Sequence, residues 1–153
     1  MQEDSYTFKR HSKAHEYEFF SEGAKGTIRK MIQFQSLPDH NNMYNLAFGD
    51  WDEENGTIND HVKTNNGDRQ KILTTVAKTV YDFMQGNGNI KIIARGSTPS
   101  RTRLYQMGIA AFWLDIREHF NVDGYISNEW ESFRPNRNYE AFLLMHKELT
   151  IFE

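Results

Sequence analysis

The sequence predicts an α+β domain in which two helices pack on one face of a mixed, largely antiparallel sheet. Three observations predict this fold class. Residues 17–63 contain short segments of alternating apolar and polar residues, separated by turn signals. Two later segments carry apolar residues at the spacing of an amphipathic helix, and a short apolar run lies between them. The expected order of elements is β-β-β-β-α-β-α-β-β.

Length and composition fit one domain. The chain has 153 residues, of which 38% are hydrophobic and 14% aromatic, and this is enough apolar material for a core. Residues 1–14 are polar, so we expect a flexible N-terminus there and a single domain over residues 15–153.

Four strands are expected before the first helix. Turn signals separate them, and Asn55-Gly56 is a strong signal for a hairpin. We therefore expect an antiparallel meander. Its strands cover Tyr17–Phe20, Thr27–Gln35, Met43–Gly49 and, more weakly, Thr57–Lys63.

The apolar period changes to that of a helix over Asp68–Gln85. We expect Asn66-Gly67-Asp68 to cap this helix and Gly86-Asn87-Gly88 to end it. The near-continuous apolar run Ile90–Ala94 then predicts a strand buried on both faces.

A second helix is expected to begin at Thr98 and Pro99 and to reach Phe120. Two further strands follow at Val122–Ser127 and Tyr139–Lys147, separated by a polar loop over Glu129–Asn138. The β-β-β-α-β-α part of the order resembles ribonuclease-H-like topology, and this comparison is topological only. A nuclease of that class would need an Asp in residues 90–95, where there is none, so two-metal chemistry is disfavoured.

Composition narrows the function classes. A net charge of −3 gives no reason to expect a nucleic-acid coat or a membrane-surface protein, so any basic site must come from local clustering. The chain has no cysteine, which excludes disulfides, thiolate metal sites and cysteine nucleophiles. The segment MQEDSYTFKRHSKAHEYEF lacks the apolar stretch of a signal peptide, and no apolar run is long enough for a membrane span. We expect a cytoplasmic protein of bacterial type without membrane contact.

The segment most informative about function is Ile92–Tyr105, in which a buried strand runs into a turn that opens a helix. The first N–H groups of a helix have no intrahelical acceptor, and the helix dipole places about half a positive charge there. Phosphate and carboxylate bind at such termini. Gly96 would let the backbone approach a ligand, and Ser97, Thr98 and Ser100 would supply hydroxyl donors.

Arginines occupy this helix start, where acidic residues are usual. Arg101 and Arg103 lie in its first turns, Arg95 precedes it, and no acidic residue lies between Asp82 and Asp115. Cations at the positive end of a helix cost about 0.3–1 kcal/mol each when exposed. A bound anion would offset that cost, and so would a carboxylate of the fold, because Arg forms bidentate pairs with both phosphate and carboxylate. The candidate ligand-binding residues are Arg95, Gly96, Ser97, Thr98, Ser100, Arg101, Arg103 and Tyr105.

Several blocks of the sequence resemble a known family. They are Tyr44–Asp50 (YNLAFGD), Asn66-Gly67-Asp68, Gly96–Tyr105 (GSTPSRTRLY) and Asn138–Phe142 (NYEAF). Together they resemble the signature blocks of a small bacterial domain family of unknown function, from about Tyr17 to Lys147. The resemblance implies a single-domain bacterial protein and carries over no catalytic residue.

Other constellations point less clearly to a function. The acidic hairpin Asp50–Glu54 lacks the spacing of a calcium loop, and the six histidines lack metal-ligand spacing, so we expect no metal or cofactor. Ser97 and Ser100 are candidate nucleophiles by position, but the Gly-x-Ser-x-Gly elbow is missing. Trp51 and Trp130 are expected in loops.

Three hypotheses about function follow. In the first, the segment from Arg95 to Tyr105 binds a phosphate-bearing ligand, with RNA or a nucleotide as the leading class; any catalysis would be metal-independent, with a histidine or Tyr105 carrying a proton. In the second, the protein is a non-enzymatic interaction module or homodimer, and the arginines pair with the acidic hairpin or with a protein partner. The third, weaker hypothesis is a hydrolase that uses Ser97 or Ser100. Whether the protein is an enzyme stays open at this point.

Overall fold

A computed structural model describes residues 4–11, 15–40, 42–59 and 66–147. Its strands form one sheet in the order β1-β2-β3-β4-β6-β9-β7-β8, with the short β5 paired to β4. All neighbouring strands are antiparallel except β4 and β6, which are parallel. The strands are β1 Lys9–His11, β2 Glu16–Gly23, β3 Gly26–Ser36, β4 Met43–Asp52, β5 Thr57–Asn59, β6 Lys91–Ala94, β7 Phe120–Ile126, β8 Glu129–Ser132 and β9 Ala141–His146.

The predicted α+β class and the meander are confirmed. Strands β2, β3 and β4 pair in sequence, with Tyr17 opposite Ile32 and Ile32 opposite Phe48. This register places Tyr17, Ile32 and Phe48 on one face of the sheet, together with Phe19, Phe34 and Leu46, because side chains alternate along a strand. The weaker predicted strand over Thr57–Lys63 is β5, whose last residue is Asn59; the remainder of that prediction lies outside the described residues.

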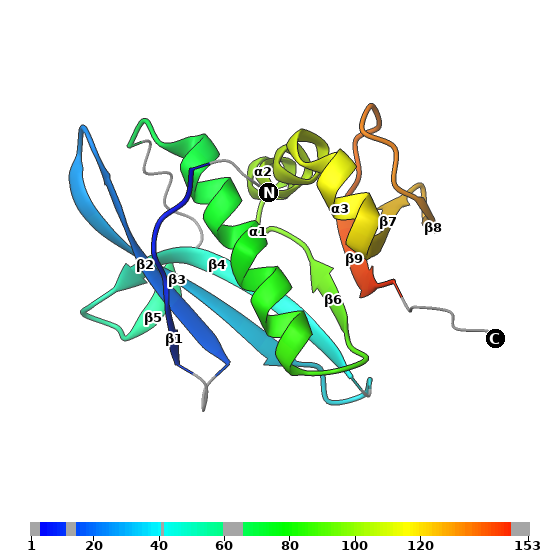
Figure 1. Ribbon diagram of the computed structural model, residues 1–153, viewed down its shortest axis with the longest axis horizontal. Helices are drawn as coiled ribbons and strands as arrows, with labels where there is room; N and C mark the ends of the chain where they lie inside the picture. Colours follow the sequence, from blue (N-terminus) through cyan, green and yellow to red (C-terminus); the bar gives the residue numbers. More distant parts are fainter. Residues whose placement is uncertain (1–3, 12–14, 41, 60–65, 148–153) are drawn as a thin grey trace.

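Three helices form the second layer, α1 Arg69–Gly86, α2 Pro99–Ala111 and α3 Trp113–His119. Figure 1 shows α1 lying across the strands of the meander, with α2 and α3 continuing the helical layer toward β7 and β9. The core lies between the layers. It joins Phe34 and Phe48 of the sheet to Val80 and Phe83 of α1 and to Ile109 of α2.

The second predicted helix is divided in two at Phe112. This residue leaves helical geometry (φ −110°, ψ 23°), and its N–H still reaches the carbonyl of Gly108 at 3.2 Å. The bend keeps both Phe112 and Ile116 buried, while Trp113 packs against Phe133 with ring centroids 4.9 Å apart. Burial of these side chains on two sides of the segment accounts for the break, which neither Pro nor Gly marks.

Two further segments differ from the sequence-based expectations. The loop expected over Glu129–Asn138 begins with strand β8, so Trp130 lies in a strand, as Trp51 does in β4. The N-terminal segment expected to be frayed contains β1, and the Tyr6 N–H donates to Thr75 Oγ1 of α1 at 2.8 Å. Residues 4–11 therefore pack on the domain, and Figure 1 shows them beside α1.

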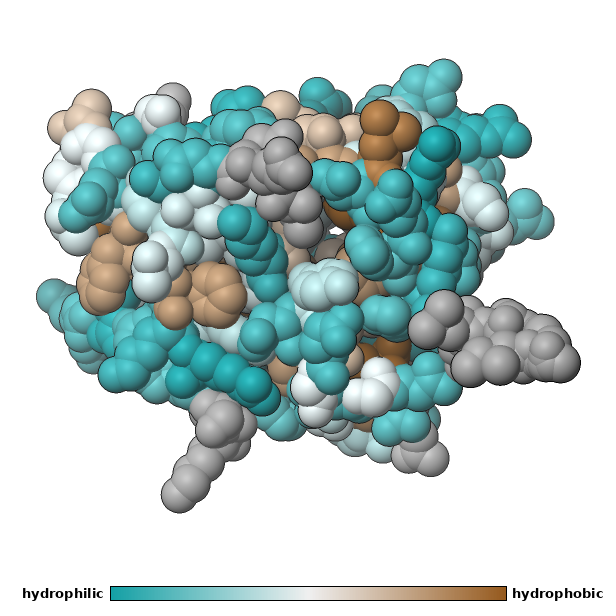
Figure 2. All heavy atoms as spheres, in the orientation of Figure 1, coloured by the Kyte–Doolittle hydropathy of each residue, from teal (hydrophilic) through white to brown (hydrophobic). Residues whose placement is uncertain are grey.

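The surface is mostly polar on the face shown in Figure 2, with apolar atoms gathered over α2 and α3. Exposed apolar side chains on these helices are Met107, 39% exposed, and Leu114, 68% exposed. Phe20 on β2 is a further exposed apolar side chain, at 48% exposure. None of the helices in the described part of the chain is long and apolar enough to span a bilayer.

Candidate functional site

The start of α2 has the cap that the sequence predicts. The Thr98 hydroxyl accepts a hydrogen bond from the Arg101 backbone N–H at 3.2 Å, and Pro99 is the first helical residue. A side-chain oxygen at this position satisfies one of the N–H groups that an α-helix leaves without a partner. The residue types of this turn therefore fix where α2 begins.

The fold requires glycine at position 96 whether or not a ligand binds. A Cβ on Gly96 would lie 2.4 Å from the Thr102 backbone nitrogen and 2.6 Å from the Arg101 Cβ. The Gly96 N–H donates to Thr102 Oγ1 at 2.9 Å, and the Thr102 hydroxyl donates to the Thr98 carbonyl at 3.2 Å. The turn thus folds back onto the first turn of α2, and only glycine fits there.

The eight candidate residues differ in exposure. Arg101 is buried, with its guanidinium 5.7 Å from the centroid of the Phe48 ring, and the Tyr105 ring is part of the core. Gly96 and Thr98 are half-buried. The structure therefore directs Arg101 and Tyr105 into the fold. The remaining candidates are exposed, namely Arg95, Ser97, Ser100 and Arg103.

The acidic hairpin has partners on β3. Asp50 forms an ion pair with the buried Lys30, and Glu53 pairs with Arg29 at 3.1 Å. Within the described ranges of the chain, neither Arg95 nor Arg103 forms an ion pair with a carboxylate. In the described part of the chain, the hairpin carboxylates of Asp50 and Glu53 therefore pair with residues of β3 and do not pair with Arg95 or Arg103.

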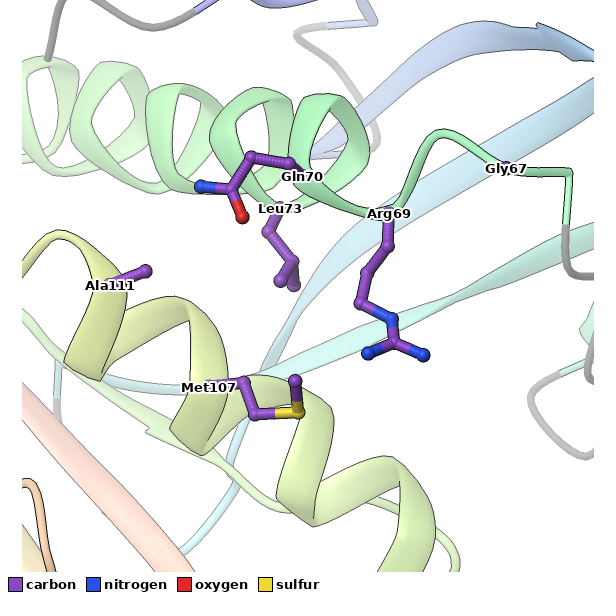
Figure 3. A pocket seen from close by; sticks show the side chains of 6 residues that line it. All are labelled: Gly67, Arg69, Gln70, Leu73, Met107 and Ala111. Carbon is purple, nitrogen blue, oxygen red and sulfur yellow. The ribbon is translucent and has the colours of Figure 1, made fainter.

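A groove of about 460 Å³ lies between the first turns of α1 and the second half of α2 (Figure 3). The Arg69 side chain extends from α1 toward α2, and Leu73 and Met107 face each other across the groove. The volume falls within the range of about 300–1,000 Å³ typical of small-molecule sites. The lining residues are Gly67, Arg69, Gln70, Leu73, Met107 and Ala111.

Arg103 is the candidate residue that lies on the same face of α2 as the groove wall. Arg103 precedes Met107 by four residues and Ala111 by eight, and residues at this spacing share one face of a helix. Arg103 therefore lies one helical turn toward the start of α2 from the groove wall. The sequence analysis did not identify Arg69, because one arginine after a capping segment forms no cluster. The approach of α1 to α2, which places Arg69 and Met107 around one groove, has no local sequence signal.

The first turn of α1 differs from the predicted cap. Asp68 occupies the N-cap position, but its side chain makes no capping hydrogen bond. Its Oδ2 instead accepts from the hydroxyls of Tyr6 and Ser21. The first turn of α1 contains no acidic residue, so at the positive end of this helix dipole the N-cap residue Asp68, whose Oδ2 is engaged by Tyr6 and Ser21, supplies the carboxylate.

The loop between β8 and β9, which contains Arg134 and Arg137, is tied to the fold. Arg137 pairs with Glu131 at 3.5 Å, and the Tyr139 hydroxyl donates to Glu131 Oε2 at 2.7 Å. Burial and this hydrogen bond raise the pKa of Tyr139, so its hydroxyl stays a donor. Across the residues that the structure describes, no three His, Asp or Glu side chains gather as metal ligands would.

Comparison with protein families gives one match, over residues 2–147. The chain belongs to DUF6934, a family of unknown function. The match covers the meander, all three helices and the strands that follow, and it fits the single-domain family that the sequence blocks resemble. No curated protein and no solved structure matches the chain. The family supplies no activity for this DUF6934 protein, so its function is argued from the groove.

Proposed function

We propose that this DUF6934 protein binds a phosphate-bearing ligand in the α1–α2 groove. The observation that carries the proposal is the exposed Arg69, which lines the groove from α1, together with the exposed Arg103, which lies on α2 one helical turn before the lining residue Met107. Within the described residues neither pairs with a carboxylate. Guanidinium groups bind phosphate through two parallel hydrogen bonds, as they bind carboxylate, and the larger charge and additional oxygens of a phosphate group suit two guanidinium groups.

The helix geometry supports the same ligand. Gly67, Arg69 and Gln70 bring the first turn of α1 to the edge of the groove, where the helix dipole favours an anion. The proposal shifts the site from the start of α2 to the space between α1 and α2. Arg103 then contacts the ligand, and Arg95 contributes positive potential from the turn before α2. The proposal assumes a cytoplasmic protein.

Thermal unfolding tests the proposal. Phosphate should raise the unfolding midpoint of the wild type in a saturable way, because a ligand that binds only the folded state stabilises it. Sodium chloride at matched ionic strength should not do so. Arg69→Ala and Arg103→Ala should each lose most of the phosphate effect. Arg117→Ala is the matched control, since Arg117 is an exposed arginine on α3 and therefore on neither of the two helices that form the groove. Equal phosphate effects in all four proteins would contradict the proposal.

A non-enzymatic interaction module is the second candidate function, and one observation favours it. Leu114 is 68% exposed on α3, and Met107 is 39% exposed on α2. In this candidate the arginines serve the fold or a protein partner. Sedimentation of the wild type and of Leu114→Ser distinguishes it. Self-association that the substitution abolishes would support a homodimer, and a monomer in both proteins would leave phosphate binding as the better account.

A further inference from the structure

The α1–α2 groove has two chemically different parts. Arg69 and Gln70 line the groove at the first turn of α1, where the backbone of Gly67 also lines it. Leu73, Met107 and Ala111 line the rest, and these side chains contain no hydrogen-bonding group except the weakly accepting Met sulfur. A ligand of phosphate alone would use the first part and leave the second part in water.

The apolar part is shaped by close packing of the two helices. A Cβ on Gly108 would lie 3.4 Å from Leu73 Cδ2, so α1 and α2 approach closely at the floor. Met107 stands 39% exposed on the wall, and its thioether is adaptable and polarisable. Such a surface favours a flat apolar group, which gains contact area on both walls without losing hydrogen bonds.

The spacing of the two parts fits one molecule of moderate size. Arg103 lies one helical turn from Met107, about 6 Å along α2, and two turns from Ala111, about 12 Å. A phosphate held by Arg69 and Arg103 would therefore be separated from the apolar wall by a distance that one pentose fills. Gln70 adds an amide that donates and accepts, as recognition of a sugar hydroxyl requires.

We infer that the ligand of this groove is a mononucleotide, with its phosphate at Arg69 and Arg103 and its base against Leu73, Met107 and Ala111. This inference rests on the proposed function and names its substrate class. A polynucleotide is a poorer fit, because strand binding requires a continuous basic track, whereas here the basic residues lie at one end of an apolar groove in a protein of net charge −3.

Titration calorimetry with the full chain separates the contributions of phosphate and base. The probes are inorganic phosphate, ribose 5-phosphate, adenosine 5′-monophosphate and a ten-nucleotide single-stranded RNA. We expect adenosine 5′-monophosphate to bind about tenfold tighter than ribose 5-phosphate, because its base buries apolar surface against Leu73, Met107 and Ala111. The RNA should show no further gain per nucleotide.

Two variants test where the base lies. Met107→Ser should remove the advantage of the nucleotide over ribose 5-phosphate and leave phosphate affinity unchanged. Ala111→Leu should do the same by filling the groove without adding charge. Leu114→Ser is the matched control, because Leu114 is a still more exposed apolar side chain and lies outside the groove. This variant should still bind the nucleotide more tightly than ribose 5-phosphate.

The outcomes distinguish the inference from the proposal on which it rests. Equal binding of adenosine 5′-monophosphate and ribose 5-phosphate, with phosphate binding intact, overturns the inference and leaves the proposed function standing. RNA that binds far tighter than the mononucleotide also overturns the inference, in favour of a strand ligand. Absence of binding by all four probes overturns both.

Discussion

The guanidinium of Arg101 lies 5.7 Å from the centroid of the Phe48 ring and joins the first turn of α2 to strand β4. Arg101 is buried, whereas Arg103, on the same turn of helix, is exposed. Two arginines two residues apart thus have different environments, because successive residues of a helix point about 100° apart. The first supports the fold, and the second is available to a ligand.

Arg101→Ala is expected to lower the free energy of unfolding by about 1–3 kcal/mol, since it removes a buried packing surface and a cation–π contact. Arg103→Ala should stay within about 0.5 kcal/mol of the wild type, as is usual for exposed positions. Urea denaturation of the three proteins measures both values. Comparable destabilisation by the two substitutions would contradict the division of roles.

Thr98→Ala tests the cap of α2. Loss of the hydroxyl that accepts from the Arg101 N–H should cost about 1 kcal/mol of stability. Ser100→Ala provides the control, since Ser100 is exposed and is a residue of α2 itself, after the cap position. If both substitutions leave the denaturation midpoint unchanged, the Thr98 cap contributes nothing to the fold.

Gly96→Ala should destabilise the protein by about 1–3 kcal/mol, because the added methyl group meets backbone that has nowhere to move. Gly108→Ala offers a contrast within α2. Its Cβ would make ordinary contact with Leu73, and alanine favours a helix over glycine by about 1 kcal/mol, so this substitution should be neutral or stabilising. The opposite order of stabilities would refute the packing argument for Gly96.

Glu18 gives the fold an acid-sensitive contact. Burial raises its pKa, but hydrogen bonds from His11 at 2.8 Å and Arg29 at 2.6 Å outweigh burial and leave the pKa below its usual value. A carboxylate with a lowered folded-state pKa stabilises the fold above its unfolded pKa, and this stability is lost as pH falls through the folded value.

Between about pH 5 and pH 3, the wild type should therefore lose stability more steeply than Glu18→Gln, which carries no charge to lose. At neutral pH the variant should be the less stable of the two, because it breaks a buried ion pair. Urea denaturation at several pH values measures the two slopes. Parallel pH profiles would show that Glu18 does not account for the acid sensitivity.

Much of the fold follows from local sequence, and the exceptions have identifiable physical causes. The cap at Thr98 and Pro99 and the alternation in β2–β4 depend on neighbouring residues, so both are legible in the sequence. The break at Phe112 depends on the burial of Phe112 and Ile116 together. Strand β8 is short, mostly exposed and at the edge of the sheet, so its residues show no apolar alternation.

The candidate site was only partly predictable for the same reason. The sequence indicates the basic segment from Arg95 to Arg103, but it does not show that Arg101 packs on Phe48. The groove brings Arg69 to the same side as Met107, which is 38 residues later in the chain. A contact of that range is set by how α1 and α2 cross, and no local pattern encodes the crossing.

Titration of phosphate into isotopically labelled protein, followed by amide NMR, shows whether a phosphate group binds between α1 and α2. Saturable shifts of the Arg69, Gln70 and Arg103 amides are expected, with smaller changes in the turn at Ser97 and in β8. Saturable shifts confined to the turn before α2 and absent from α1, or shifts that grow linearly with salt over the whole surface, would contradict phosphate binding in the groove.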